Sequence, residues 1–91
     1  MEFIWETPTE IDVALAQRLK RIRKFKKLTQ KELAARCNVS YGALKKFEQS
    51  GDISLKSLTK IAMELGVSGE LHRLFTEPQY ASIEEVLRDG R

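Results

Sequence analysis

Hydrophobic residues recur three or four positions apart along most of this 91-residue chain, which is the spacing of one face of an α-helix. The pattern predicts one long helix from Thr9 to about Lys26. Shorter helices are expected at 29–37, 40–49, 54–65 and 68–75, with another short one from residue 82. The pattern therefore predicts an all-α fold, in which residues 9–75 form a compact five-helix domain between an N-terminal extension (1–8) and a C-terminal tail (76–91).

Each predicted helix has its apolar residues on one side, and we expect these residues to form the core. Thr9, Ser54 and Ser68 are the expected N-caps of the first, fourth and fifth helices. Gly66 is expected in the left-handed region just past the fourth helix. The residues predicted to point inward are Ile11, Leu15, Leu19, Ile22 and Phe25, then Leu33 and Ala34, then Leu44 and Phe47, and finally Leu55, Leu58, Ile61, Ala62 and Leu65.

The segment 29–49 has the sequence of two short helices joined by a tight turn. Thr29 and Glu32 are three residues apart, as in a capping box that starts a helix. Asn38 is expected to end that helix, because asparagine is one of the few residues that readily adopt the left-handed conformation of such a turn. Val39 is expected to be buried in the turn, and Ser40 to cap the second helix. The outer side of the second helix then carries Tyr41, Gly42, Lys45, Lys46 and Gln49.

Charge is distributed unevenly along the chain, although the net charge is only +3. Residues 13–60 hold thirteen basic and three acidic residues, residues 1–12 hold four acids and no base, and residues 61–91 hold three bases and six acids. The basic region contains the 29–49 segment and its outward-facing helix. A basic surface at such a segment is typical of proteins that bind nucleic acid.

Gln30, Leu33, Ala34, Asn38-Val39-Ser40, Leu44, Phe47 and Glu48 have the order and spacing of a known motif. They resemble the DNA-binding helix-turn-helix of Cro and the phage repressors, the Xre-like family. The resemblance covers about residues 18–75 and implies a lambda-repressor-like fold. It also implies a dimeric repressor of transcription that binds double-stranded DNA at a near-palindromic operator, with the helix 40–48 in the major groove.

The resemblance further implies roles for individual residues. Gln30 would hold a DNA phosphate at the N-terminus of the first motif helix. Arg23 and Glu48 match a pair that joins the first and third helices, and the alternative is two independent surface charges. Gly42 implies either a close approach of the backbone to the groove or weaker base recognition. The residues implied at the DNA are Ser40, Tyr41, Gly42, Lys45, Lys46 and Gln49, where either lysine would donate to guanine or to phosphate, and Lys26 and Lys27, which would add non-specific attraction.

Leu71, Leu74 and Phe75 are the expected dimer interface, although they could also complete the core. The cluster Phe3-Ile4-Trp5 is a second candidate for that contact. The opening Trp5-x-Thr7-Pro8, the phrase FEQSGDISLKSL and the tail, Phe75 with segment 82–87, also resemble small Xre-like proteins that accompany HipA-type kinase toxins. That narrower resemblance implies an antitoxin that represses its own operon, against a stand-alone repressor or, less favoured, an adaptor that binds only protein.

The remaining residues give no support to an enzyme. The chain has one histidine, His72, and one cysteine, Cys37, in different predicted helices, so that no Cys/His pair and no metal-ligand spacing is formed. We therefore expect no cofactor and no metal. Cys37 is expected to be a small buried hydrophobic residue. The chain has no apolar run that could span a membrane and no signal-peptide pattern, which predicts a cytoplasmic protein.

Overall fold

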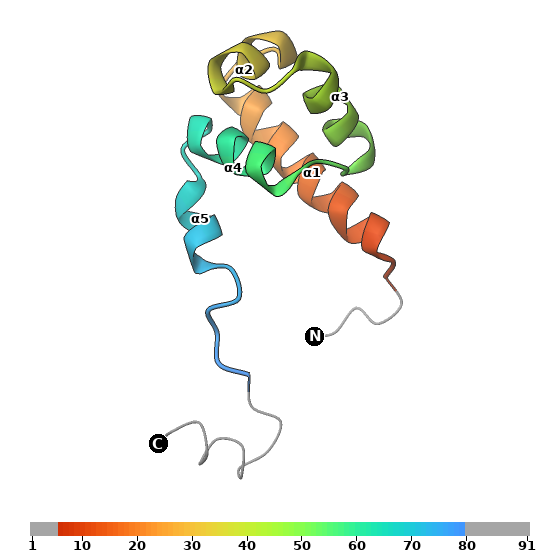
Figure 1. The fold of residues 1–91 in the computed structure, drawn as a ribbon, viewed down its shortest axis with the longest axis vertical. Helices are drawn as coiled ribbons and strands as arrows, with labels where there is room; N and C mark the ends of the chain where they lie inside the picture. The colour runs from red at the N-terminus through yellow and green to blue at the C-terminus, as the bar shows by residue number, and fades with distance from the viewer. Residues whose placement is uncertain (1–5, 80–91) are drawn as a thin grey trace.

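The computed structural model describes residues 6–79, and within them the chain forms five α-helices. These are α1 (Pro8–Phe25), α2 (Gln30–Cys37), α3 (Tyr41–Ser50), α4 (Leu55–Glu64) and α5 (Ser68–Arg73). Figure 1 shows α2, α3 and α4 gathered along α1, with α5 leading away from α4. The predicted all-α fold is confirmed over this range. The cluster Phe3-Ile4-Trp5 and the predicted helix from Ser82 lie outside the described residues.

The core lies where α1, α2, α3 and α4 meet. Its largest fully buried side chains are Phe47, Leu33, Leu44, Ile61 and Leu65. The smaller buried residues that pack with them are Ala16, Ala34, Cys37 and Val39, together with Leu19 from α1. Because a residue as small as Ala34 lets two helices cross closely, α3 can pack against α2 at this point.

The prediction that Thr9 caps α1 was wrong. Thr7 is the N-cap: its hydroxyl accepts from the Glu10 backbone N–H at 3.1 Å, and the Glu10 carboxylate accepts from the Thr7 backbone N–H at 2.9 Å. Pro8 occupies the first helical position, where its fixed φ suits a helix and its missing N–H has no intrahelical partner to lose. The helix therefore begins at the proline that we expected to precede it.

Three residues that were predicted to point inward are exposed: Ile11 by 50%, Phe25 by 86% and Leu55 by 73%. Ile11 lies near the start of α1, Phe25 is its last residue, and Leu55 is the first residue of α4. Helical spacing defines which face a residue occupies, but not how far the neighbouring helices extend along that face. The ends of the apolar stripes are therefore uncovered.

The connection from α3 depends on a glycine. Gly51 has φ of +77° and lies so close to α1 that an added Cβ would be 2.5 Å from the carbonyl carbon of Asp12. Its backbone N–H donates to the Phe47 carbonyl at 2.7 Å. Only glycine accommodates both this conformation and this approach, so Gly51 fixes the distance between the end of α3 and α1.

The structure at the junction of α4 and α5 agrees only in part with the prediction from the sequence. Gly66 has the predicted left-handed φ, +78°, and Val67 turns back so that its N–H donates to the Ala62 carbonyl at 2.9 Å. The prediction that Ser68 caps α5 was wrong, because Val67 precedes the helix and no side chain caps it. None of the residues of α5 is buried.

Candidate nucleic-acid interface

The start of α2 is fixed by the predicted capping box. The Thr29 hydroxyl accepts from the Glu32 N–H at 3.1 Å, and the Glu32 carboxylate accepts from the Thr29 N–H at 2.8 Å. The bond from the Thr29 backbone is the main reason why the pKa of Glu32 lies below its ordinary value. This exposed end of α2 also carries the positive end of the helix dipole, which favours an anion such as a phosphate.

The turn between α2 and α3 has the geometry that its residues predict. Asn38 is left-handed, with φ of 58° and ψ of 46°, and the next N–H, from Val39, donates to the Ala34 carbonyl at 3.0 Å. Val39 is buried. The Ser40 hydroxyl accepts from the Ala43 N–H at 3.0 Å and starts α3. The turn therefore sets the direction in which α3 leaves α2.

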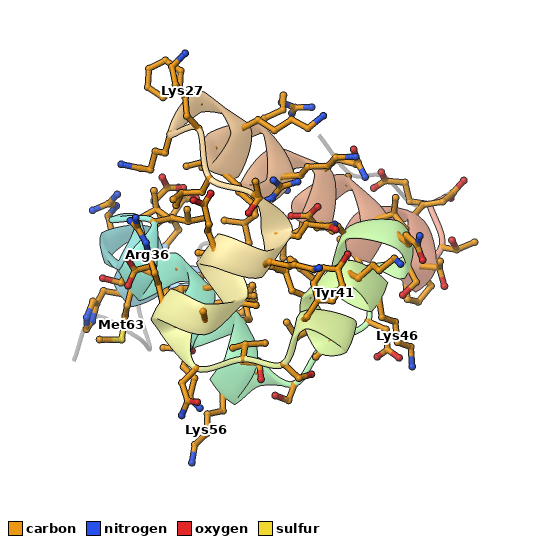
Figure 2. All side chains as sticks on the ribbon, turned by 90° about the horizontal axis from the view of Figure 1, so that it is seen from above. Lys27, Arg36, Tyr41, Lys46, Lys56 and Met63 are labelled. Atoms are coloured by element: carbon orange, nitrogen blue, oxygen red, sulfur yellow. The ribbon has the colours of Figure 1, made fainter. Side chains whose placement is uncertain are left out.

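The outer side of α3 is open to solvent. Leu44 and Phe47 are fully buried, which confirms the inward face and turns the opposite face of the helix outward. Figure 2 views this face and shows Lys46 extending away from the domain. The residues on and before α3 that were expected at DNA are all exposed: Ser40, Tyr41, Gly42, Lys45, Lys46 and Gln49.

A buried hydrogen-bond network fixes α3 to α1 and α2, and we call it the Glu48 network. Arg23 of α1 donates to both carboxylate oxygens of Glu48, from Nε at 2.7 Å and from Nη2 at 2.9 Å. The two residues are only 6% and 4% exposed. Gln30 of α2 donates to Glu48 Oε1 at 2.8 Å, and Gln17 of α1 donates to the Glu48 carbonyl at 2.9 Å. The structure thus brings Arg23 and Glu48 together as a buried ion pair.

Gln30 has a structural contact in addition to the phosphate contact that the sequence implies. One hydrogen of its side-chain amide is used by Glu48, and an amide nitrogen carries two. Gln30 is half-buried at the first position of α2. The Glu48 network therefore sets the orientation of the amide at the place where a phosphate contact is expected.

Lys31 and Asp52 are two neighbours of the α3 face that the sequence analysis missed. Lys31 Nζ of α2 lies 5.5 Å from the centre of the Tyr41 ring, and Lys45 Nζ lies 5.6 Å from it. Lys46 Nζ lies 3.0 Å from Asp52 Oδ2, in a pair whose side chains are about two-thirds exposed. Such exposed pairs contribute little, so Lys46 can exchange this partner for another. Lys45 is four residues after Tyr41, a spacing that signals contact on a helix; the contact of Lys31 depends on how α2 and α3 cross.

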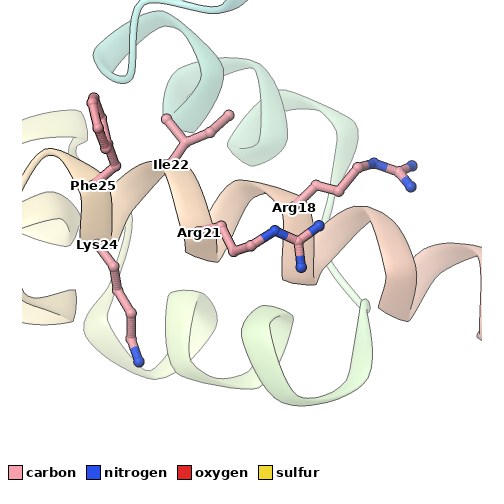
Figure 3. A pocket seen from close by; sticks show the side chains of 5 residues that line it. All are labelled: Arg18, Arg21, Ile22, Lys24 and Phe25. Atoms are coloured by element: carbon pink, nitrogen blue, oxygen red, sulfur yellow. The ribbon is translucent and has the colours of Figure 1, made fainter.

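Lys26 and Lys27 do not join the α3 face. Both are exposed beyond the end of α1, and Figure 2 shows Lys27 on the opposite side of the view from Lys46. Other cations of α1 surround an open pocket on its outer side, beside the exposed ring of Phe25 (Figure 3). The residues that line this α1 pocket are Arg18, Arg21, Ile22, Lys24 and Phe25.

The residues expected at a dimer interface differ in exposure. Leu71 is half-buried, whereas Leu74 is 52% and Phe75 95% exposed. Met63 of α4 is also 64% exposed and shares a pocket with Leu71. Large apolar side chains on α4, on α5 and just after α5 are therefore partly or largely exposed to water in an isolated domain.

Comparison with protein families decides the class of this domain. The family model described as helix-turn-helix, HTH_3, matches residues 19–71. The chain belongs to this helix-turn-helix family. The domain is of the Xre/Cro type and binds DNA, as in transcriptional regulators, which are typically not enzymes. No curated protein matches the chain.

Three further observations concern the cysteine, membrane spans and metal ligands of this helix-turn-helix protein. The one cysteine, Cys37, is buried as expected, and burial raises the pKa of its thiol. Within residues 6–79, no helix is long and apolar enough to cross a membrane, and no three His, Cys, Asp or Glu side chains are grouped to hold a metal ion.

Proposed function

We propose that this protein is a sequence-specific transcriptional repressor that binds double-stranded DNA as a homodimer, with α3 in the major groove. The observation that carries the proposal is the exposed basic side of α3, held in one orientation by the Glu48 network. A recognition helix needs both properties, because its side chains must reach base edges in a fixed register.

Each residue proposed to contact DNA is assigned a role from its position on or near α3. Ser40, Tyr41 and Gly42 lie at the N-terminal end of α3, which in this motif contacts base edges. Lys45 and Lys46 follow one turn later and donate to guanine or to phosphate. Gln30 and the N-terminus of α2 hold a phosphate beside them. Gln49, Lys26 and Lys27 contribute at the margins, the two lysines through non-specific attraction.

A dimer is supported by the apolar surface of α4 and α5. Met63, Leu74 and Phe75 expose large hydrophobic side chains there, and burying them against a second copy would remove this surface from water. Two domains about one helical turn of DNA apart, roughly 34 Å, would recognise a near-palindrome. As a DNA-binding regulator, the protein is expected in the cytoplasm.

Selection of bound fragments from random duplex DNA tests the class and the stoichiometry together. We expect a two-fold symmetric consensus and a log affinity that falls linearly with log salt, by about 0.9 for each phosphate contacted. Absence of any consensus would contradict the proposal. A reporter gene placed behind the consensus should be less active with the wild-type protein, which distinguishes a repressor from an activator.

The variant Lys46→Ala tests whether the outer side of α3 contacts the DNA. Lys46→Ala should weaken binding to the consensus by about 1–3 kcal/mol if Lys46 donates to a base, with relaxed preference at one position. If it donates only to phosphate, all sequences weaken alike. Arg18→Ala, which removes an exposed cation of the α1 pocket, is the control and should weaken binding less. An equal loss of affinity in both variants would mean that non-specific electrostatic attraction, and not contact with α3, accounts for DNA binding.

The antitoxin hypothesis is not needed for this proposal. Of the residues that suggest it, Trp5 and segment 82–87 lie outside the described part of the chain. Co-purification with a HipA-type kinase would support it. Binding to such a kinase without any affinity for DNA would instead support a protein-binding adaptor.

A further inference from the structure

Tyr41 is the first residue of α3 and is 40% exposed. Two ammonium groups lie near its ring, one from Lys31 of α2 at 5.5 Å and one from Lys45 of α3 at 5.6 Å. Cations at this distance are attracted to the face of an aromatic ring. The ring therefore has a cationic neighbour from each of the two helices of the motif, and Figure 2 labels Tyr41 where α2 and α3 meet.

The surroundings of the ring are open on the side of Gly42. Gly42, the next residue, has no side chain, and a Cβ added there would meet no heavy atom within 4 Å apart from its two chain neighbours and the backbone of its own helix. The result is an exposed aromatic ring with two cations near its face, at the end of α3 that is proposed to contact base edges.

We infer that Tyr41 recognises the 5-methyl group of a thymine in the operator, an inference that rests on the proposed function. In the major groove, base edges offer hydrogen-bond donors and acceptors, and the thymine methyl is the apolar group among them. An aromatic ring gains most from that methyl, whereas lysines suit the phosphates and guanines around it. The competing role for Tyr41 is a hydrogen bond from its hydroxyl to a phosphate.

The test uses the full-length protein and the selected consensus, with each thymine replaced in turn by deoxyuridine, which removes only the methyl group. At one position in each half-site we expect the wild-type affinity to fall about fourfold, the factor for one buried methyl-sized group. Tyr41→Phe keeps the ring and should keep this dependence. Tyr41→Ala should bind thymine and deoxyuridine sites equally. Because Tyr41 is exposed, both variants should fold, which circular dichroism would verify.

A second readout places 5-methylcytosine or cytosine at the same position. The methylated site should bind the wild-type protein more tightly, and Tyr41→Ala should not distinguish the two. A consensus that is indifferent to every thymine methyl would overturn the inference alone. So would an equal loss of affinity in Tyr41→Phe and Tyr41→Ala, because it would assign the contact to the hydroxyl. Failure to select any consensus would overturn the proposed function as well.

Discussion

Two helices of this domain are held in contrasting ways. α3 is fixed to α1 by the buried Arg23–Glu48 pair and by the close approach of Gly51 to Asp12. α5 is joined to α4 through Gly66 and Val67, has no side-chain cap and contains no buried residue. Among the described residues, the buried charged side chains are those of Arg23 and Glu48 alone.

This difference suits the two helices to different roles: α3 has a fixed orientation, and α5 is free to associate with a second copy. A buried ion pair with additional hydrogen bonds contributes little net stability, but it permits one arrangement of the groups that it joins. α3 is proposed to require such an arrangement, because base contacts depend on register. Exposed apolar residues such as Leu74 and Phe75 can adjust to a partner instead. The domain therefore places its fixed helix toward the proposed DNA and its loosely held helix toward the proposed second copy.

The largest effect is expected from Glu48→Ala. The variant would leave the Arg23 guanidinium buried without its carboxylate, which typically costs about 3–5 kcal/mol in the free energy of unfolding. Urea denaturation measures this loss. Glu70→Ala on exposed α5 is the control and should change the free energy by about 0.5 kcal/mol or less. Equal stabilities of the two variants would mean that the Glu48 network does not join α1 to α3 in solution.

Two glycines with the same φ give the next comparison. Gly66→Ala should destabilise by about 1–2 kcal/mol, because alanine is disfavoured in the left-handed region while its Cβ would meet no atom within 4 Å. Gly51→Ala carries the same penalty and also overlaps the backbone of Asp12 and Val13, which should add about 1–3 kcal/mol. Thermal unfolding of both variants measures the difference. Equal losses would contradict the close packing of α3 on α1.

The features of this fold that could be predicted from the sequence depend on interactions between residues close together in the chain. Thr29, Glu32, Asn38 and Ser40 act on backbone groups within a few residues, so their spacing alone defines the corner. The error at the start of α1 is also local. Thr7 and Thr9 are both followed three residues later by an acid, and the position of Pro8 as the first helical residue decides between them.

The contacts that the sequence did not predict join residues far apart in the chain. Arg23 and Glu48 were paired only through the family resemblance. The bond of Gln30 to Glu48 and the approach of Lys31 to Tyr41 depend on the crossing of α2 and α3, which helical spacing does not determine. Exposure of Phe25 likewise depends on how far the neighbouring helices cover the end of α1. The sequence thus predicted the outward-facing side of α3, but not the contacts between its residues and those of α1 and α2.

The smallest change in stability is expected from the exposed phenylalanines, Phe25 at the α1 pocket and Phe75 after α5. Serine at either position should alter the unfolding free energy of the monomer by about 0.5 kcal/mol or less, because 86% and 95% of these residues are already exposed to water. Their effects on association should differ. Phe75→Ser should shift the protein toward monomers in light scattering over a range of concentrations, whereas Phe25→Ser should not. If only Phe25→Ser dissociates the dimer, the second copy binds at the α1 pocket, where three cations of each copy would have to be accommodated.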